Sequence, residues 1–242
     1  MNQRIVLLLA VGILIFGSSI AIIYNHVSKP HAHSSVTVIP STNQTAKNQT
    51  IATNSADVTN PVPANTNKSS PTVVVPTQDF FSRVTKKPFG ISITPATSPV
   101  QPERFSGYHT GADAETTVPE QSVDVPVYSI ADGTVIAVEH VNGYGGLLAI
   151  QYFVQGEDLI AIYGHIRLSS ATVKSGDAVT AGEQIAVLGT GFSTETDGER
   201  EHLHFGLISG TKLDVRGYVQ NTSELSLWLD PVAWLKARGA SA

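Results

Sequence analysis

Residues 126–166 read PVYSIADGTVIAVEHVNGYGGLLAIQYFVQGEDLIAIYGHI, a series of short apolar, β-branched runs separated by turn residues. Asp132-Gly133 and Asn142-Gly143 are dipeptides that favour tight turns between paired strands, so each predicts a β-hairpin. Further short segments of the same kind follow towards the C-terminus. The pattern therefore predicts a mainly β, antiparallel domain.

Composition and charge narrow the classes of function. The chain has 242 residues and no cysteine, so disulfide partners, thiolate zinc sites and iron–sulfur clusters are excluded, and a metal must be held by histidine and carboxylate. Lys and Arg total 15 against 20 Asp and Glu, a formal charge of −5, so we expect no nucleic-acid partner. The charge is uneven, because residues 1–104 carry +5 and residues 105–242 carry −10.

The N-terminal part predicts a membrane anchor. Residues 5–24 form an uncharged apolar run of 20 residues, which as a helix would span about 30 Å of hydrocarbon. We expect residues 1–4 to be a cytoplasmic tail and the remainder to lie outside the cytoplasm in a single-pass membrane protein. The alternative is a cleaved signal peptide, which would leave a secreted protein.

The rest of the chain divides into a linker, a transitional segment and a domain. Residues 25–78 are rich in Ser, Thr, Asn and Pro and cannot bury enough apolar surface to order themselves, so we expect a disordered linker. Residues 79–104 are transitional, with a short strand expected around Ile91–Thr94. Residues 105–238 form the predicted domain, which should end in one short helix with Asp230 at its N-cap.

Three fragments of the domain carry residues suited to metal chemistry. GYHTGAD places His109 and Asp113 four residues apart, and on an extended strand this even spacing puts both on one face. EHLHFGL places His202 and His204 on one face of a predicted strand, with the apolar side chains opposite. His165 follows an apolar run and a glycine that gives its ring space. Taken singly, each fragment has an ordinary structural explanation.

Together, the fragments indicate metal-assisted hydrolysis. They supply two nitrogens and one oxygen for a metal, and they leave two imidazoles over. A catalytic zinc site uses three protein ligands and a water whose pKa falls to about 7. Spare imidazoles are suited to moving the proton of that water, because their pKa lies near working pH. Spacing alone does not decide which histidine of HxH would bind the metal.

The fragments resemble the lysostaphin-type (LytM-domain) zinc endopeptidases, whose pattern is an early HxxxD, a middle histidine and a late HxH. The similarity also includes VYSIADGTVIAV and VKSGDAVTAGEQIAVLG and covers residues 105–235. It implies a hybrid of antiparallel β-sandwich and barrel, and one zinc ion. By position, it implies His109, Asp113 and His204 as the metal ligands and His165 and His202 as the catalytic pair.

The resemblance further implies hydrolysis of peptide bonds in peptidoglycan cross-links or stems, with peptidoglycan peptides as partners. The alternative is a non-catalytic wall-binding or activator module with the same fold. A third possibility is an autoinhibited enzyme in which residues 80–104 cover the cleft and Asp79 or Glu103 binds the metal.

Two further features bear on function. The chain departs from the family pattern at residues 195–201, ETDGERE, where an acidic loop beside the cleft would favour cationic peptides unless it is merely solvated. The glycine-spaced segment around Lys174 is also similar to biotinyl and lipoyl carrier domains. Because Lys174 is not at a central hairpin tip, a carrier function has little support.

Overall fold

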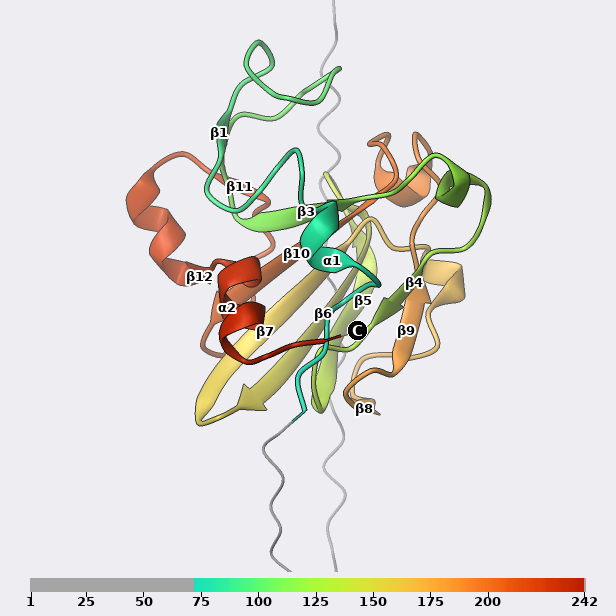
Figure 1. The fold of residues 1–242 in the computed structure, drawn as a ribbon, viewed down its shortest axis with the longest axis vertical. Coiled ribbons are helices and arrows are strands. Elements are labelled where there is room, and N and C mark those ends of the chain that lie inside the picture. The colour runs from blue at the N-terminus through green and yellow to red at the C-terminus, as the bar shows by residue number, and fades with distance from the viewer. Residues whose placement is uncertain (1–71, 242) are drawn as a thin grey trace, which may run out of the picture. The chain divides into compact units, whose positions relative to one another are not determined.

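In the computed structural model, the Asn142-Gly143 turn joins β5 (Gly133–Val141) to β6 (Gly145–Val154) as an antiparallel hairpin (Figure 1). The Tyr144 amide donates to the Val141 carbonyl at 3.0 Å and closes the turn. Gly143 has φ of 92°, in the left-handed region that glycine enters without steric cost. The hairpin predicted from this dipeptide is therefore confirmed.

The largest sheet extends from this hairpin and has the strand order β12-β10-β7-β6-β5-β8, with β3 also paired to β10. Its remaining strands are β3 (Gly111–Glu115), β7 (Glu157–Gly164), β8 (Ala178–Val179), β10 (His202–Ser209) and β12 (Trp228–Leu229). β7 borders β10 on one side, while β3 and β12 pair with successive parts of its other side. β10 therefore lies between neighbours along its length.

Two small sheets complete the β structure. They are formed by β1 (Ser92–Ile93), β2 (Gly107–His109) and β11 (Tyr218–Val219), and by β4 (Pro126–Tyr128) and β9 (Gln184–Val187). The remaining elements are short helices: α1 (Phe80–Arg83), α2 (Pro231–Ala237) and the 3₁₀ turns η1 (Pro119–Ser122), η2 (Leu168–Ser170), η3 (Thr194–Thr196) and η4 (Thr222–Leu227). The predicted mainly β class and the short strand near Ile91 are confirmed.

Two sequence predictions about strand pairing are wrong. The Asp132-Gly133 dipeptide does not close a hairpin, because β4 pairs with β9 while β5 pairs with β6 and β8. The barrel-like closure is also absent from the described part of the chain, since β8 borders only β5 and the opposite edge of the sheet borders only β10. The sheets are open.

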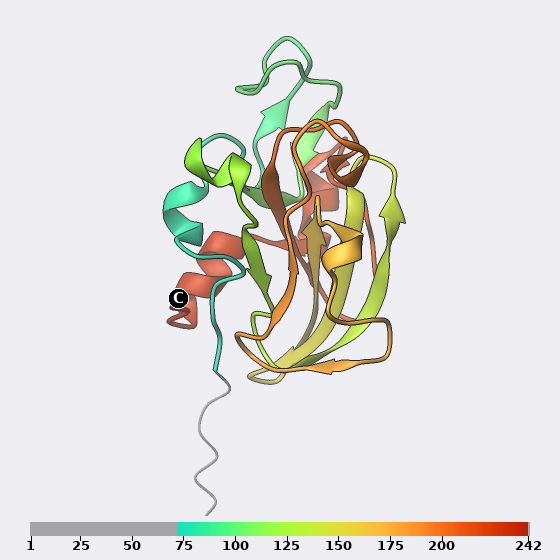
Figure 2. The ribbon, with the colours of Figure 1, turned by 90° about the vertical axis from the view of Figure 1, so that its right-hand side faces the viewer.

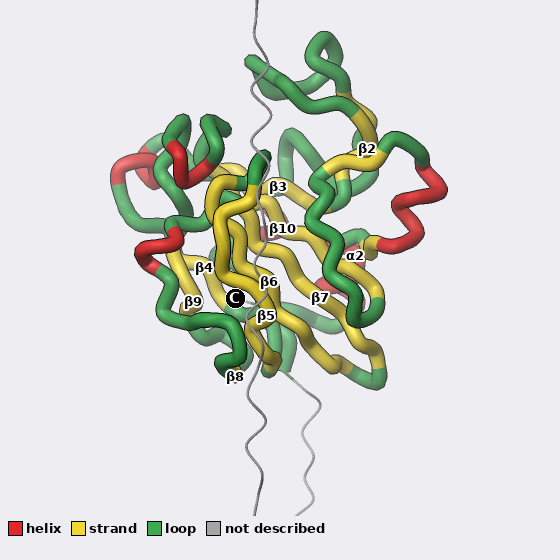
Figure 3. Tube along the Cα trace, turned by 180° about the vertical axis from the view of Figure 1, so that it is seen from behind, coloured by secondary structure: helices red, strands yellow, loops and turns green. Residues whose placement is uncertain are grey.

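Both faces of the main sheet are buried. One apolar cluster contains Leu203, Phe205 and Tyr163, and it packs under α1, α2 and the β4-β9 pair. In Figures 1 and 2, α1 and α2 lie on the same side of the main sheet. Figure 3 shows the opposite side, where β5, β6 and β7 face the viewer. A second cluster, with Ile160 and Ile162, fills that face. This two-sided burial explains why β7 is apolar without interruption from Leu159 to Tyr163.

The C-terminal helix forms as the sequence predicts. The Asp230 carboxylate accepts hydrogen bonds from the amides of Val232 and Ala233 at 2.9 and 3.2 Å. Pro231 occupies the first turn, where its missing N–H has no intrahelical partner to lose. Gly239, with φ of 65°, follows the end of the helix.

The end of the segment predicted as a linker, residues 25–78, packs against the domain. Val73 and Val75 are buried in the main apolar cluster, and Val74 forms a parallel bridge with Ser241. The Tyr128 amide donates to the Pro76 carbonyl at 2.8 Å. Three valines in succession give this end of the predicted linker enough apolar surface to dock.

The structure describes residues 72–241. The predicted cytoplasmic tail (1–4), the predicted membrane anchor (5–24) and residues 25–71 of the predicted linker lie outside the described residues. Within residues 72–241, no helix combines the length and apolar character that a membrane span needs.

A substitution of Phe80 tests whether the segment before β2 contributes to the stability of the domain. Its side chain is fully buried and meets Phe205 edge to face at a centroid distance of 5.6 Å. We expect Phe80→Ala to lower the free energy of unfolding by about 3–5 kcal/mol, measured by urea denaturation. Phe153→Ala, at a position that is 67% exposed, should change it by less than about 0.5 kcal/mol. Equal effects of the two variants would contradict the packing described.

Candidate metal centre

The pairing of β10 with its two neighbours brings the predicted site residues together. His204 lies opposite Asp113 of β3 on one side and opposite Gly164 of β7 on the other. Paired positions in adjacent strands have Cβ atoms about 4.5–5.5 Å apart, so register alone brings these side chains within reach of each other. His165 follows Gly164 directly, and His109 ends β2. All five predicted residues converge.

Three of these side chains direct their donor atoms at one point. His109 Nε2 lies 3.0 Å from His204 Nδ1, and Asp113 Oδ1 lies 3.2 Å from each of these nitrogens. All three side chains are buried. Four ligands arranged tetrahedrally at zinc distances of about 2.0–2.1 Å would be about 3.3 Å apart. The spacing and the donor types of His109, Asp113 and His204 therefore fit a zinc ion.

Hydrogen bonds on the far side of each imidazole orient the two rings. His109 Nδ1 lies 3.3 Å from the Pro88 carbonyl, and His204 Nε2 lies 3.3 Å from the Tyr144 hydroxyl. A proton on each of these nitrogens leaves the other nitrogen free to bind a metal. This is the arrangement in which outer contacts set the tautomer of a metal-binding histidine.

His165 and His202 lie beside this group and are not part of it. Their ring centroids are 4.3 Å apart. His202 Nδ1 donates to the Arg200 carbonyl at 2.8 Å, while its Nε2 lies 3.3 Å from Asp113 Oδ2. His165 has φ of 62°, and its Nδ1 is buried without a hydrogen-bond partner among the described residues. A strained backbone carrying an unpaired nitrogen is typical of a functional position.

Glycines make room for the histidines. A Cβ on Gly111 would lie 2.6 Å from His204 Nε2, and one on Gly164 would lie 2.4 Å from the Tyr144 ring. Any larger residue at either position would displace the ring it contacts. The glycine before His165 therefore provides space for the Tyr144 ring, whereas the sequence predicts space for the ring of His165.

Burial sets the charge states of the site. It lowers the pKa of His204 to about 4 and that of His165 well below the ordinary value, which the neighbouring His202 lowers further. Burial alone would raise the pKa of Asp113, but His109 and His202 outweigh it and hold that pKa well below its usual range. At neutral pH the site thus presents a carboxylate with neutral His165 and His204, the forms in which these groups bind metal or accept protons.

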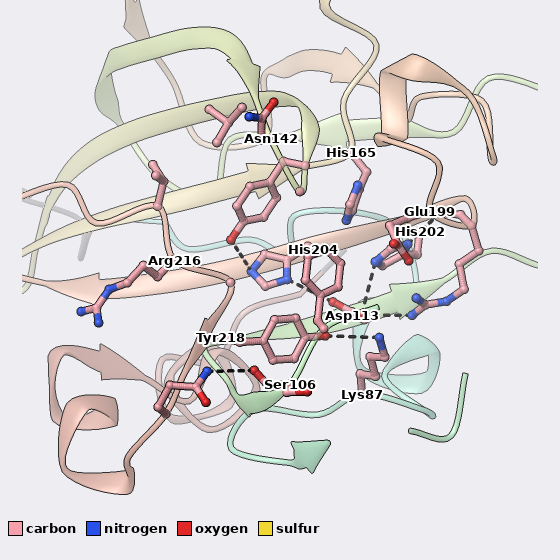
Figure 4. A pocket seen from close by; sticks show the side chains of 18 residues that line it. Lys87, Ser106, Asp113, Asn142, His165, Glu199, His202, His204, Arg216 and Tyr218 are labelled. Carbon is pink, nitrogen blue, oxygen red and sulfur yellow. Dashed lines mark hydrogen bonds and ion pairs between the residues drawn. The ribbon is translucent and has the colours of Figure 1, made fainter. Parts of the chain in front are cut away.

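The site opens into a cavity of about 390 Å³ (Figure 4). Asp113, His165, His202 and His204 line it, whereas His109, which is fully buried, does not. In Figure 4 the cavity also presents Tyr218, whose ring packs on His109 at a centroid distance of 5.1 Å. The geometry suits a metal centre with access for a substrate.

Several residues at the site carry no signal in the sequence. Tyr144 bonds His204 from the β5-β6 turn, and Tyr218 receives a hydrogen bond from Lys87 at 3.2 Å. Lys87 is buried and also pairs with Glu103. Only long-range folding brings these residues to the cavity. Arg200 is different, because it lies in the segment 195–201 where the chain departs from the family pattern.

The segment before β2 supports the site through its main chain. The Lys87 carbonyl accepts from the Asp113 amide at 3.0 Å, and the Ile91 carbonyl accepts from the His109 amide at 3.0 Å. The donor group, by which we mean His109, Asp113 and His204, contains neither Asp79 nor Glu103. The Glu103 carboxylate instead binds Lys87 and Ser98. Among the described residues, this segment supports the site through main-chain hydrogen bonds and supplies no fourth metal ligand.

The expectation for the acidic loop 195–201 is not supported, because three of its four carboxylates, all but that of Glu201, form ion pairs within the domain. Asp197 and Glu199 both bind Arg104 at 2.8 Å. Glu195 faces Arg167 at 3.4 Å. These ion pairs leave little free negative charge with which to select cationic peptides, and they attach the loop to the domain.

The chain is similar to one protein family and to one curated protein. Residues 107–215 match the model of Peptidase family M23. An uncharacterized protein of Haemophilus influenzae is 34% identical over 120 residues, which are 48% of this chain and 24% of that protein. The chain thus spans about a quarter of the length of this curated relative.

Similar solved structures include two peptidases and LytU. The catalytic domain of the antimicrobial peptidase lysostaphin from Staphylococcus simulans is 22% identical, with a TM-score of 0.44 over 67% of this chain and 99% of that chain. LytU is 25% identical, with a TM-score of 0.45 over 64% and 85%. A zinc-containing peptidase from Vibrio cholerae is 26% identical, with a TM-score of 0.33 over 54% and 41%.

The lowered pKa of His204 predicts a pH dependence of stability in metal-free protein. A histidine of ordinary pKa, 6.5, takes up a proton in the unfolded chain at pH values where folded His204, with a pKa of about 4, does not. Stability therefore falls as the pH is lowered through this window. We expect His204→Asn to remove roughly 3 kcal/mol of the change between pH 7 and 4, measured by urea unfolding with a chelator.

His140→Asn is the control for this experiment, because His140 is exposed on β5. This variant should keep the pH dependence of the unchanged protein. The same pH dependence in the His204→Asn variant would show that His204 is not buried as described.

Removal of the supporting segment gives a second prediction. A chain that begins at Phe105 lacks the carbonyls that hold the His109 and Asp113 amides, as well as buried Phe80. We expect it to bind zinc more weakly than the full chain, measured side by side by competition with a chromophoric chelator. Zinc affinity equal to that of the full chain would show that the segment does not support the site.

Proposed function

The chain carries a LytM-type peptidase domain of family M23, as its sequence resemblance predicts, and from this premise we propose a zinc-dependent endopeptidase that hydrolyses peptidoglycan. The bonds cleaved are peptide bonds in cross-links or stems. The observation that carries the proposal is the convergence of His109 Nε2, Asp113 Oδ1 and His204 Nδ1 within 3.0–3.2 Å, beside two further histidines that face a cavity.

In the proposed enzyme, His109, Asp113 and His204 would hold one zinc ion. Zinc in such a site activates water and polarises the carbonyl that is attacked. The protein's own contribution is to place groups that move protons. With His202 Nδ1 bonded to the Arg200 carbonyl, His202 Nε2 is the atom that exchanges a proton in the cavity. Asp113 Oδ2, at 3.3 Å, stabilises a proton on that nitrogen.

His165 lies where it can accept a proton from a group in the cavity. Its low pKa keeps the ring neutral at working pH, and the ring lies against His202 on the cavity wall. The tyrosine hydroxyl at His204 stays protonated, because burial raises the pKa of Tyr144 far above its ordinary value. The His204 ring therefore keeps a neutral partner across the pH range in which the enzyme would work.

The setting of the enzyme is also a proposal. The uncharged run at residues 5–24 and the polar tract that follows it support a single-pass membrane protein with the domain outside the cytoplasm. A tether of this kind fits an enzyme whose substrate is the wall. Cleavage after the apolar run would give the secreted form.

Two histidine variants test the proposal. We expect His204→Ala to lose both bound zinc and peptide release from purified cell walls, because it removes a ligand. His165→Ala should keep zinc at one ion per chain and lose most peptide release, because it removes only a proton acceptor. General acid–base groups contribute about 10²–10⁴-fold to rate. The measurements are metal analysis and mass spectrometry of released peptides.

Full hydrolysis by either variant would reject the assigned roles. An unaltered protein that binds wall material and releases no peptides would favour the alternative, a non-catalytic wall-binding or activator module.

A further inference from the structure

Arg200 is placed to act on the metal centre without belonging to the donor group. It belongs to the loop 195–201 and lies two residues before His202. Its side chain is 11% exposed, and its Nη2 nitrogen donates to Asp113 Oδ2 at 3.0 Å. The other oxygen of the same carboxylate, Oδ1, is the one that faces His109 and His204.

The guanidinium is itself fixed by a second carboxylate. Arg200 Nε lies 2.9 and 3.1 Å from the two oxygens of Glu115, and Nη2 also contacts Glu115. Asp113 and Glu115 are alternate residues of β3, so their side chains emerge on the same face of the strand. One planar fork therefore spans two carboxylates on a rigid strand, a geometry that lysine cannot reproduce.

The main chain of the same residue orients a second site group, because the Arg200 carbonyl accepts the hydrogen bond from His202 Nδ1 at 2.8 Å. Arg200 therefore contacts two of the site residues, Asp113 through its side chain and His202 through its carbonyl.

We propose that Arg200 is a positioning residue for the metal centre: by holding Asp113 Oδ2 it turns Oδ1 towards His109 and His204. The loop 195–201 then belongs to the metal site and is not chiefly a substrate-selecting loop. The inference rests on the proposed function, in that it assumes that these three residues bind zinc. Outer contacts of this kind typically change metal affinity by about 10–100-fold.

The test is zinc affinity, measured on the full chain by competition with a chromophoric chelator. We expect Arg200→Met to bind zinc about 10–100-fold more weakly than the unchanged protein. Arg200→Lys keeps the charge without the fork, so its affinity should lie between the two. In an Asp113→Asn background, Arg200→Met should cause no further loss, because Arg200 acts through the Asp113 carboxylate.

Arg83→Met is the matched control. Arg83 is also 11% exposed and also makes a bidentate ion pair, with Glu120, but it touches none of the donor group. This variant should keep the zinc affinity of the unchanged protein. Circular dichroism of each metal-free variant checks that it is folded, and Arg200→Lys carries the test if Arg200→Met does not fold.

The outcomes distinguish a failure of the role of Arg200 from a failure of the proposed function. An unchanged protein that binds zinc and releases peptides, together with an Arg200→Met variant of equal zinc affinity, overturns the role of Arg200 alone. Equal losses in the Arg83→Met and Arg200→Met variants also overturn it, because both would then be effects on folding. An unchanged protein without zinc affinity overturns the proposed function itself.

Discussion

The register of β10 against its two neighbours is the constraint on which the site depends. His204 is paired with Asp113 on one side and with Gly164 on the other, so two ladders of main-chain hydrogen bonds fix the distances among groups that lie far apart in the sequence. A shift of one residue along β10 would exchange the two faces of the strand. The histidines would then point into the apolar cluster that now holds Leu203 and Phe205.

The rigid pairing of these strands allows the protein to bury a group of polar side chains whose burial lowers the stability of the fold. Two imidazoles and a carboxylate lie within 3.0–3.2 Å of one another in a region largely closed to water. Burial keeps His204 and His165 neutral, while the surrounding rings keep Asp113 ionised. Contacts from Pro88, Tyr144 and Arg200 then orient the groups from behind. A cation at the centre would offset much of the cost of this arrangement.

The local features of the site could be predicted from the sequence, and its long-range contacts could not. Strand alternation places His202 and His204 on one face, and a turn dipeptide identifies the β5-β6 hairpin, because both signals are local. The Asp132-Gly133 prediction failed because β4 pairs with β9, almost 60 residues away in the chain. The roles of Tyr218 and Arg200 likewise depend on tertiary packing. Three carboxylates of the acidic loop pair with Arg104 and Arg167, which the loop does not contain.

The most direct test of the central claim is a crystal structure of the zinc-soaked protein with anomalous diffraction data at the zinc edge. The account predicts one strong peak about 2.0–2.2 Å from His109 Nε2, Asp113 Oδ1 and His204 Nδ1, with His165 and His202 outside the coordination sphere. A peak bound by His165 or His202, or a zinc-soaked crystal with no peak among these three atoms, would contradict it.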